Sequence, residues 1–190
     1  VMGPVELLSG ADARLVGLVS TLTASDLDLS SPCAGWAVRS LLSHTISSID
    51  AFAAAVDGGS GPTEAELFSG ADILGSDPLA VAEQSIGRSQ RAWATIGDWQ
   101  HPVTTVLGSM PAAEAISIIP CSTLTHSWDL AVAVGRTVEF DDAEAALAEG
   151  VGAALVPALQ PQGLFGPGVE LGGDASPTQR VIAFAGRNPL

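Results

Sequence analysis

The segment from Pro111 to Gly135 constrains the fold most strongly, because it predicts one long helix with polar residues on an apolar background. A proline in the first turn and a glycine just past the end are typical of helix termini. Ser122, His126 and Asp129 follow one another at i, i+4 and i+7, so they lie along one stripe of the helix. Burying such side chains without partners costs roughly 1–3 kcal/mol each. The pattern therefore predicts a pocket beside this helix.

A proline inside the predicted helix adds an irregularity just before His126. Pro120 has no N–H to donate to the carbonyl of Ile116, and its ring crowds that carbonyl. We therefore expect a bend in the helix, or a π-type bulge between these two residues.

Hydrophobic periodicity predicts further helices on both sides of this segment. We expect them over residues 6–22, about 36–56, 77–96 with Asp77 as N-cap, 141–159 with an acidic N-cap, and 176–186. Val103 to Leu107 is the best strand candidate. Four long helices with one short strand or hairpin predict an all-α four-helix bundle with a C-terminal extension. We expect residues 1–190 to form a single domain.

The charge of the chain argues against two classes of partner. Seven arginines, no lysine and 21 acidic residues give a formal net charge of −14. Nucleic acids and anionic membranes are bound chiefly through cationic side chains, so we expect no nucleic acid and no membrane as partner. We expect a small-molecule substrate, and the assembly that we consider is a homodimer. No basic segment followed by an apolar one is visible at the N-terminus, so we expect a cytoplasmic protein.

Two histidines are the leading candidates for a site. In helical bundles, ligand and metal sites lie in the core, between side chains of facing helices. His44 and His126 lie on two different predicted helices. Each taken alone is more often a core residue than a ligand, so the bundle has to bring them together for the pair to indicate a site.

Four segments, in order along the chain, resemble the DinB-like helical-bundle superfamily. They are SPCAGWAVRSLLSH at 31–44, LGSMPAAEAI at 107–116, THSWDLAVAVG at 125–135, and FGPGVEL with DASPTQRVIAFAGRNP at 165–189. The closer resemblance is to an actinobacterial branch that includes the N-terminal domain of mycothiol-dependent maleylpyruvate isomerase. This resemblance implies a four-helix bundle with zinc or another divalent metal near one end. It also implies mycothiol as a thiol cofactor, since several members are thiol-dependent transferases or isomerases.

Position by position, the resemblance makes His44 the first metal ligand and His126 the last. The middle ligand of the family is an acidic residue or a histidine four positions before the last, and that position here is Ser122. A neutral hydroxyl is a poor zinc ligand, and catalytic zinc normally has three protein ligands. We therefore expect an incomplete metal site. His101 could complete it, but it precedes Pro102 in a predicted loop and has no ligand role in the resemblance.

Three functional hypotheses remain open. In the first, a metal held by His44 and His126 serves a mycothiol-type transferase or isomerase. In the second, which leads, an enzyme of isomerase, transferase or cyclase type has lost the metal and acts on a partly apolar metabolite. His126 is then its acid or base, with Ser122, His44 and Asp129 orienting it or the ligand. In the third, the protein is a non-catalytic bundle that binds a ligand.

Three further residues are candidates for substrate binding, namely Trp128, Cys121 and Arg39. Cys121 neighbours the histidine stripe and is the better thiol candidate. Cys33 is interpreted as a residue that packs in a loop, because no base is fixed beside it in the sequence.

Overall fold

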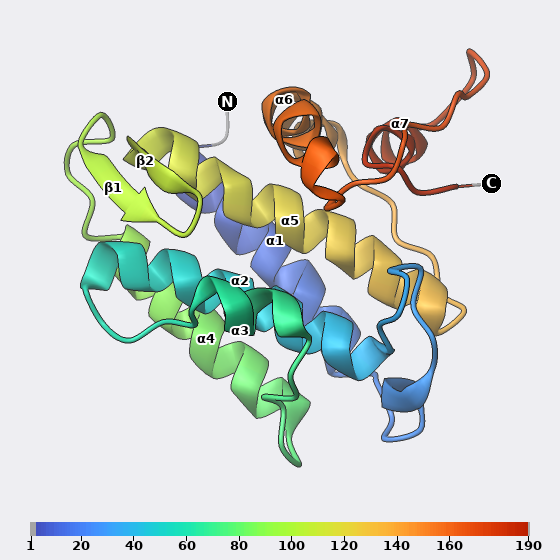
Figure 1. The fold of residues 1–190 in the computed structure, drawn as a ribbon, viewed down its shortest axis with the longest axis horizontal. Coiled ribbons are helices and arrows are strands. Elements are labelled where there is room, and N and C mark those ends of the chain that lie inside the picture. The colour runs from blue at the N-terminus through green and yellow to red at the C-terminus, as the bar shows by residue number, and fades with distance from the viewer. Residues whose placement is uncertain (1–2, 190) are drawn as a thin grey trace.

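The fold is almost entirely helical, which confirms the all-α class expected from the sequence (Figure 1). The computed structural model describes residues 3–189. The long helices are α1 (Pro4–Val19), α2 (Val38–Asp57), α4 (Pro78–Trp93), α5 (Ala112–Ala133) and α6 (Asp142–Leu159). The shorter elements are α3 (Glu64–Ser69), α7 (Pro177–Phe184), the strands β1 (Pro102–Thr105) and β2 (Gly108–Pro111), and 3-10 turns at Asp26–Asp28 and Gln160–Gln162. Within residues 3–189 there is no helix that combines the length and the apolar character of a membrane span.

Helices α1, α2, α4 and α5 form the bundle. Both α1 and α2 pack against α4 and α5, so that the four helices enclose one main core. Fully buried side chains from three of these helices fill this core: Leu8, Leu15, Leu41, Ile46, Ile49, Ile116 and Leu130. The expected four-helix bundle is confirmed.

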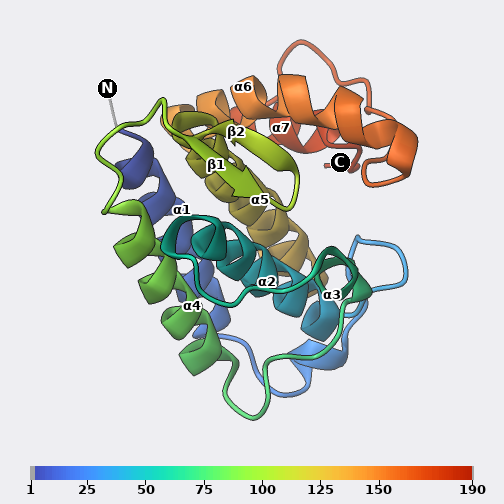
Figure 2. The ribbon, with the colours of Figure 1, turned by 60° about the vertical axis from the view of Figure 1, so that its left-hand side comes forward.

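Helices α6 and α7 form a second layer on the outer side of α5 (Figures 1 and 2). The N-terminus of α6 is held to α1, because Arg14 donates to both carboxylate oxygens of Glu144 at 3.1 and 2.6 Å. A smaller apolar cluster that includes Leu124, Phe140 and Ile182 fills the space between the layers. The C-terminal extension expected from the sequence is therefore a packed layer, in which α6 and α7 lie beside one face of α5.

The N-caps predicted from the sequence are present. The carboxylate of Asp77 accepts from the N–H of Ala80, and the carboxylate of Asp141 accepts from the N–H groups of Ala143 and Glu144. These bonds satisfy donors that have no partner inside a helix, which explains why α4 and α6 begin at these positions.

The central helix α5 runs without interruption through Pro120. The predicted helix is therefore confirmed, but the alternative of a π-type bulge before Pro120 is wrong, since the helix is of α-type throughout. Pro120 cannot donate a hydrogen bond to the carbonyl of Ile116. Ile116, Ile119 and Pro120 are all buried, so packing around this segment stabilises the helix despite that missing bond. Before α5, the expected strand is paired: β1 and β2 form an antiparallel hairpin in which Val103 faces Met110.

Candidate functional site

A cavity of about 600 Å³ lies between the bundle and the α6–α7 layer. Its walls come from the loop around Cys33, α2, α3, the turn of the hairpin, α5, α6, the segment after α6, α7 and the three residues that follow α7. The volume lies within the range of roughly 300–1,000 Å³ typical of small-molecule sites. His44, Ser122 and His126 contribute polar groups to the lining.

The two candidate histidines meet at this cavity. The ring centroids of His44 on α2 and His126 on α5 lie 5.2 Å apart, with the rings edge to face at 81°. The expected approach of these residues is confirmed, whereas a role in function remains a proposal. Trp36 and Phe68 flank His44, with ring centroids at 4.9 and 5.7 Å from its ring.

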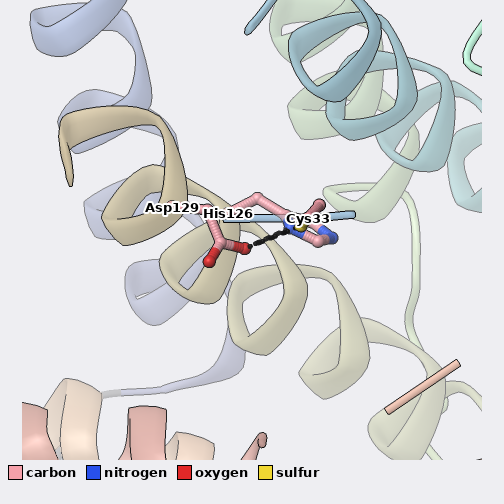
Figure 3. A group of neighbouring side chains, drawn as sticks. All are labelled: Cys33, His126 and Asp129. Carbon is pink, nitrogen blue, oxygen red and sulfur yellow. Dashed lines mark hydrogen bonds and ion pairs between the residues drawn. The ribbon is translucent and has the colours of Figure 1, made fainter. Parts of the chain in front are cut away.

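The imidazole of His126 is oriented by a buried carboxylate (Figure 3). Nδ1 of His126 lies 3.1 Å from Oδ2 of Asp129, one turn further along α5. Asp129 is fully buried, and a carboxylate can only accept at this position, so Nδ1 carries the proton. In the neutral ring, Nε2 is therefore the nitrogen with a free lone pair.

A backbone carbonyl orients the imidazole of His44 in the same way. Its Nδ1 lies 2.7 Å from the carbonyl oxygen of Leu67 in α3 and donates to it, so Nε2 is again the free acceptor. Burial, and then the nearby His126, lower the pKa of His44 to about 4, although the bond to Leu67 raises it. At neutral pH His44 is thus uncharged, and it can accept a hydrogen bond but has no second N–H to donate.

Arg187, which follows α7, holds the carboxylate of Asp129. Its Nε donates to Oδ1 at 3.1 Å and its Nη2 donates to Oδ2 at 2.9 Å. Burial raises the pKa of Asp129, but the hydrogen bond from His126 and the charge of Arg187 outweigh it and bring the pKa to about 2. Asp129 is therefore ionised and keeps His126 in place. Sequence reasoning missed Arg187, although it lies in one of the segments that carry the family resemblance.

The thiol of Cys33 completes this group of side chains (Figure 3). The loop that carries it is closed by hydrogen bonds between Ser31 and Trp36, and its Sγ donates to Oδ2 of Asp129 at 3.4 Å. Burial, followed by the charge of Asp129, raises the pKa of Cys33 to about 12, so the thiol is protonated. Cys33 packs against the core as expected for a loop residue, but its place at the site was not foreseen.

The candidates for substrate binding lie in different places. Cys121 lines the cavity, and burial raises its pKa to about 12. Trp128 instead packs in the cluster between the layers and is not part of the cavity wall. Arg39 also lies outside the cavity lining, and its guanidinium pairs with Asp72 at 3.2 Å on the surface. These helical positions face away from the cavity, which periodicity alone did not reveal.

One group of side chains has the composition of a metal site but not its environment. Ligand atoms of Cys33, His126 and Asp129 lie within 4.8 Å of one another. Both oxygens of Asp129 already accept from Arg187, whose Nη2 is also 3.6 Å from the sulfur of Cys33. A divalent cation bound there would displace the guanidinium of Arg187 from the buried carboxylate of Asp129. It would also lie beside the positive charge of that guanidinium. This group does not fit a metal ion.

The histidine pair does not form a complete zinc site either. His44 and His126 supply two imidazole nitrogens, but Ser122 adds only a neutral hydroxyl to the cavity wall. His101, which could have supplied a third imidazole, is exposed in the loop before β1 and lies outside the cavity lining. The metal implied by the family resemblance therefore lacks a third protein ligand of the usual kind.

Comparison with known proteins shows the family of the chain. The family model of the mycothiol maleylpyruvate isomerase N-terminal domain matches residues 8–131. Because this match covers more than half of the chain, the protein belongs to that family, as the sequence motifs indicated.

Two sequences are similar along nearly the whole chain, and two solved structures share the fold. Two uncharacterized proteins of Mycobacterium tuberculosis, from the strains CDC 1551 and H37Rv, are each 24% identical over 98% of this chain and 98% of their own length. The crystal structure of the mycothiol-dependent maleylpyruvate isomerase is similar with a TM-score of 0.63 and 21% identity, covering 86% of this chain and 72% of that chain. A histidine-to-alanine mutant of that enzyme has a TM-score of 0.66 and 20% identity, with the same coverage.

Proposed function

We propose that this protein is a small-molecule enzyme of isomerase or transferase type. In this proposal it works by proton transfer in the cavity between the bundle and the α6–α7 layer. One observation carries the proposal: two imidazoles line one cavity, and each uses Nδ1 for a fixed acceptor, which leaves Nε2 available. Such anchoring of one ring nitrogen is what an acid–base or ligand-binding histidine needs.

In this proposal His126 is the proton-transfer residue. Its Nε2 takes a proton from the substrate, for example from a carbon next to a carbonyl group, and returns it to another position. Asp129 acts through His126 as a positioning residue: it holds the Nδ1–H tautomer and stabilises the imidazolium that forms, because it is ionised and buried. Arg187 in turn holds Asp129.

His44 and Ser122 contribute binding groups in the proposal. His44 stays neutral, so its Nε2 accepts a hydrogen bond from a hydroxyl or thiol of the bound molecule. The hydroxyl of Ser122 can donate to a substrate oxygen, and it replaces a group that would have been a metal ligand in the family pattern.

A thiol cosubstrate such as mycothiol fits the donor and acceptor groups of the cavity. A bound thiol would supply a nucleophilic sulfur, and Nε2 of His44 is the acceptor that would hold its S–H hydrogen, while Nε2 of His126 serves the substrate. The protein's own thiols do not supply this chemistry at neutral pH, because Cys33 and Cys121 are protonated.

Deuterium exchange tests the proposal without knowledge of the natural substrate. A panel of β,γ-unsaturated ketones in D₂O is followed by NMR with metal-free protein, with and without added mycothiol. We expect incorporation of deuterium next to the carbonyl, and a loss of about 10²–10⁴-fold in His126→Gln, the usual contribution of a general base. His101→Gln is the matched control, since His101 is exposed and outside the cavity. Equal rates for the two variants, or exchange that requires added zinc, would contradict the proposal.

A further inference from the structure

We infer that the cavity selects an uncharged, predominantly hydrophobic substrate and discriminates against carboxylates. The inference rests on the proposed function for the location of the site, but it concerns binding rather than catalysis. Three independent features of the molecule support it: the charge balance of the cavity wall, the side chains at its mouth, and the charge of the whole chain.

The first feature is that the wall has no unpaired arginine. Arg187 is the one arginine in the cavity lining, and no Asp or Glu occurs there among the described residues. Its guanidinium is already neutralised by the buried carboxylate of Asp129 through two hydrogen bonds, and Nη1 donates to the carbonyl oxygen of Ala185. A substrate carboxylate in the cavity would therefore find no arginine free to pair with it, which makes its burial unfavourable.

The rest of the wall is built from apolar side chains. Helix α6 contributes Leu155, Val156 and Leu159, and α5 contributes Ile118 and Ile119. These side chains give much of the cavity wall an apolar surface. An alkyl or ring system longer than the reacting group would bury its surface against them.

The second feature is a rim of exposed apolar side chains. Phe68 of α3, Leu107 in the hairpin turn, Leu164 after α6 and Phe184 of α7 all line the cavity, yet they are between 37% and 44% exposed. They come from four separate elements. Only three other large apolar residues are as exposed in the part of the chain that the structure describes. Large exposed apolar groups that converge on one opening are typical of a ligand entrance.

The third feature is the net charge of −14. A strongly negative protein repels anions at long range and slows their association, whereas it has no such effect on neutral molecules. Together, the wall, the rim and the net charge favour the same class of ligand.

Isothermal titration calorimetry with matched probes tests this inference. The probes are nonan-2-one, its shorter homologues pentan-2-one and heptan-2-one, methyl nonanoate, and nonanoate, at pH 7.5. We expect the affinity of the ketones to rise about fourfold for each added CH₂ group, the value for full burial of a methylene. Nonanoate should bind at least about tenfold more weakly than nonan-2-one, whereas methyl nonanoate should bind like the ketone. Nonanoate binding as tightly as the ketone, or no binding of any neutral probe, would overturn the inference.

Two glycines of α6 provide matched variants that locate the binding. Gly152 is buried in the cavity wall, and a Cβ there would lie 3.5 Å from the ring of Phe184, whereas a Cβ at Gly150 would meet nothing within 4 Å. Gly152→Leu should weaken nonan-2-one binding at least about tenfold, and Gly150→Leu should leave it unchanged. Equal affinities in two folded variants would overturn the location. If Gly152→Leu fails to fold, the comparison of ketone with carboxylate in the unmodified protein still decides the inference. Because turnover is not measured, failure here is distinguishable from failure of the exchange assay.

Discussion

Arg187 and Asp129, 58 residues apart in the sequence, form a two-point hydrogen-bonded ion pair beneath His126. The carboxylate is fully buried and the arginine side chain is only 13% exposed. The pair links the segment that follows α7 to α5. It also positions the imidazole of His126, which we propose as the proton-transfer group.

Removing the arginine should therefore destabilise the protein and disturb the site. Arg187→Ala leaves a buried carboxylate without its cation, and we expect a loss of about 3–5 kcal/mol in the free energy of unfolding, measured in urea. Arg39→Ala, which breaks only the exposed pair with Asp72, should cost at most about 1 kcal/mol. Arg187→Lys should recover part of the stability but not the two-point geometry. Equal losses for Arg187→Ala and Arg39→Ala would contradict the structural role.

The titration of His44 should be visible in its own NMR signals. Burial and the neighbouring His126 lower its pKa to about 4, from an ordinary value of 6.5. The unfolded state then binds one proton more than the folded state between about pH 6.5 and 4, so this group destabilises the protein as the pH falls through that window. The ring should remain neutral down to about pH 4, and His44→Gln should lose less stability than the wild type between pH 7 and 4.5. A ring of His44 that protonates near pH 6.5 would contradict this reading of its environment.

Asp12 in α1 should have the opposite effect on pH dependence. Burial raises its pKa to about 7, although the hydrogen bond from Gln90 lowers it, and its Oδ1 has no partner among the described residues. The folded state then binds the extra proton between about pH 4 and 7, so the stability that Asp12 contributes falls as the pH rises through this window. The shift of about three pH units corresponds to about 4 kcal/mol as an upper order of magnitude.

Thermal unfolding of Asp12→Asn tests this expectation. The melting temperature of the variant relative to the wild type should rise from pH 5 to pH 8. A difference that is constant over this range would show that Asp12 titrates normally. His44→Gln serves as an internal control. The stability of this variant relative to the wild type should fall, not rise, as the pH increases over part of the same window.

The identity of residue 122 should decide metal binding. The unmodified protein should hold zinc substoichiometrically or not at all when it is purified without chelator or nickel affinity resin, because two imidazoles alone form an incomplete site. Ser122→Glu or Ser122→Asp places a carboxylate one turn before His126 on the same face of α5, and should create a site with His44. Metal analysis checks both proteins, and Ser122→Glu combined with His44→Ala should lose the metal again. Stoichiometric zinc held by His44 and His126 in the unmodified protein would refute this prediction.

The sequence by itself determined the local elements. The caps at Asp77 and Asp141, and the helix that begins after Pro111, follow from backbone hydrogen bonding and from φ restrictions within a few residues. Periodicity also indicated that the stripe containing His126 needed partners. The expectation of a helical bundle suggested the pair of His126 with His44, and the resemblance to a family assigned both to one metal site.

Only the tertiary structure decided which distant groups complete the site. Arg187 was missed, and the thiol of Cys33 was not expected beside Asp129. Periodicity reports which face of a helix is apolar, but it carries no information on which remote segment covers that face. That choice depends on how α6 and α7 pack on α5, where long-range contacts satisfy the buried carboxylate.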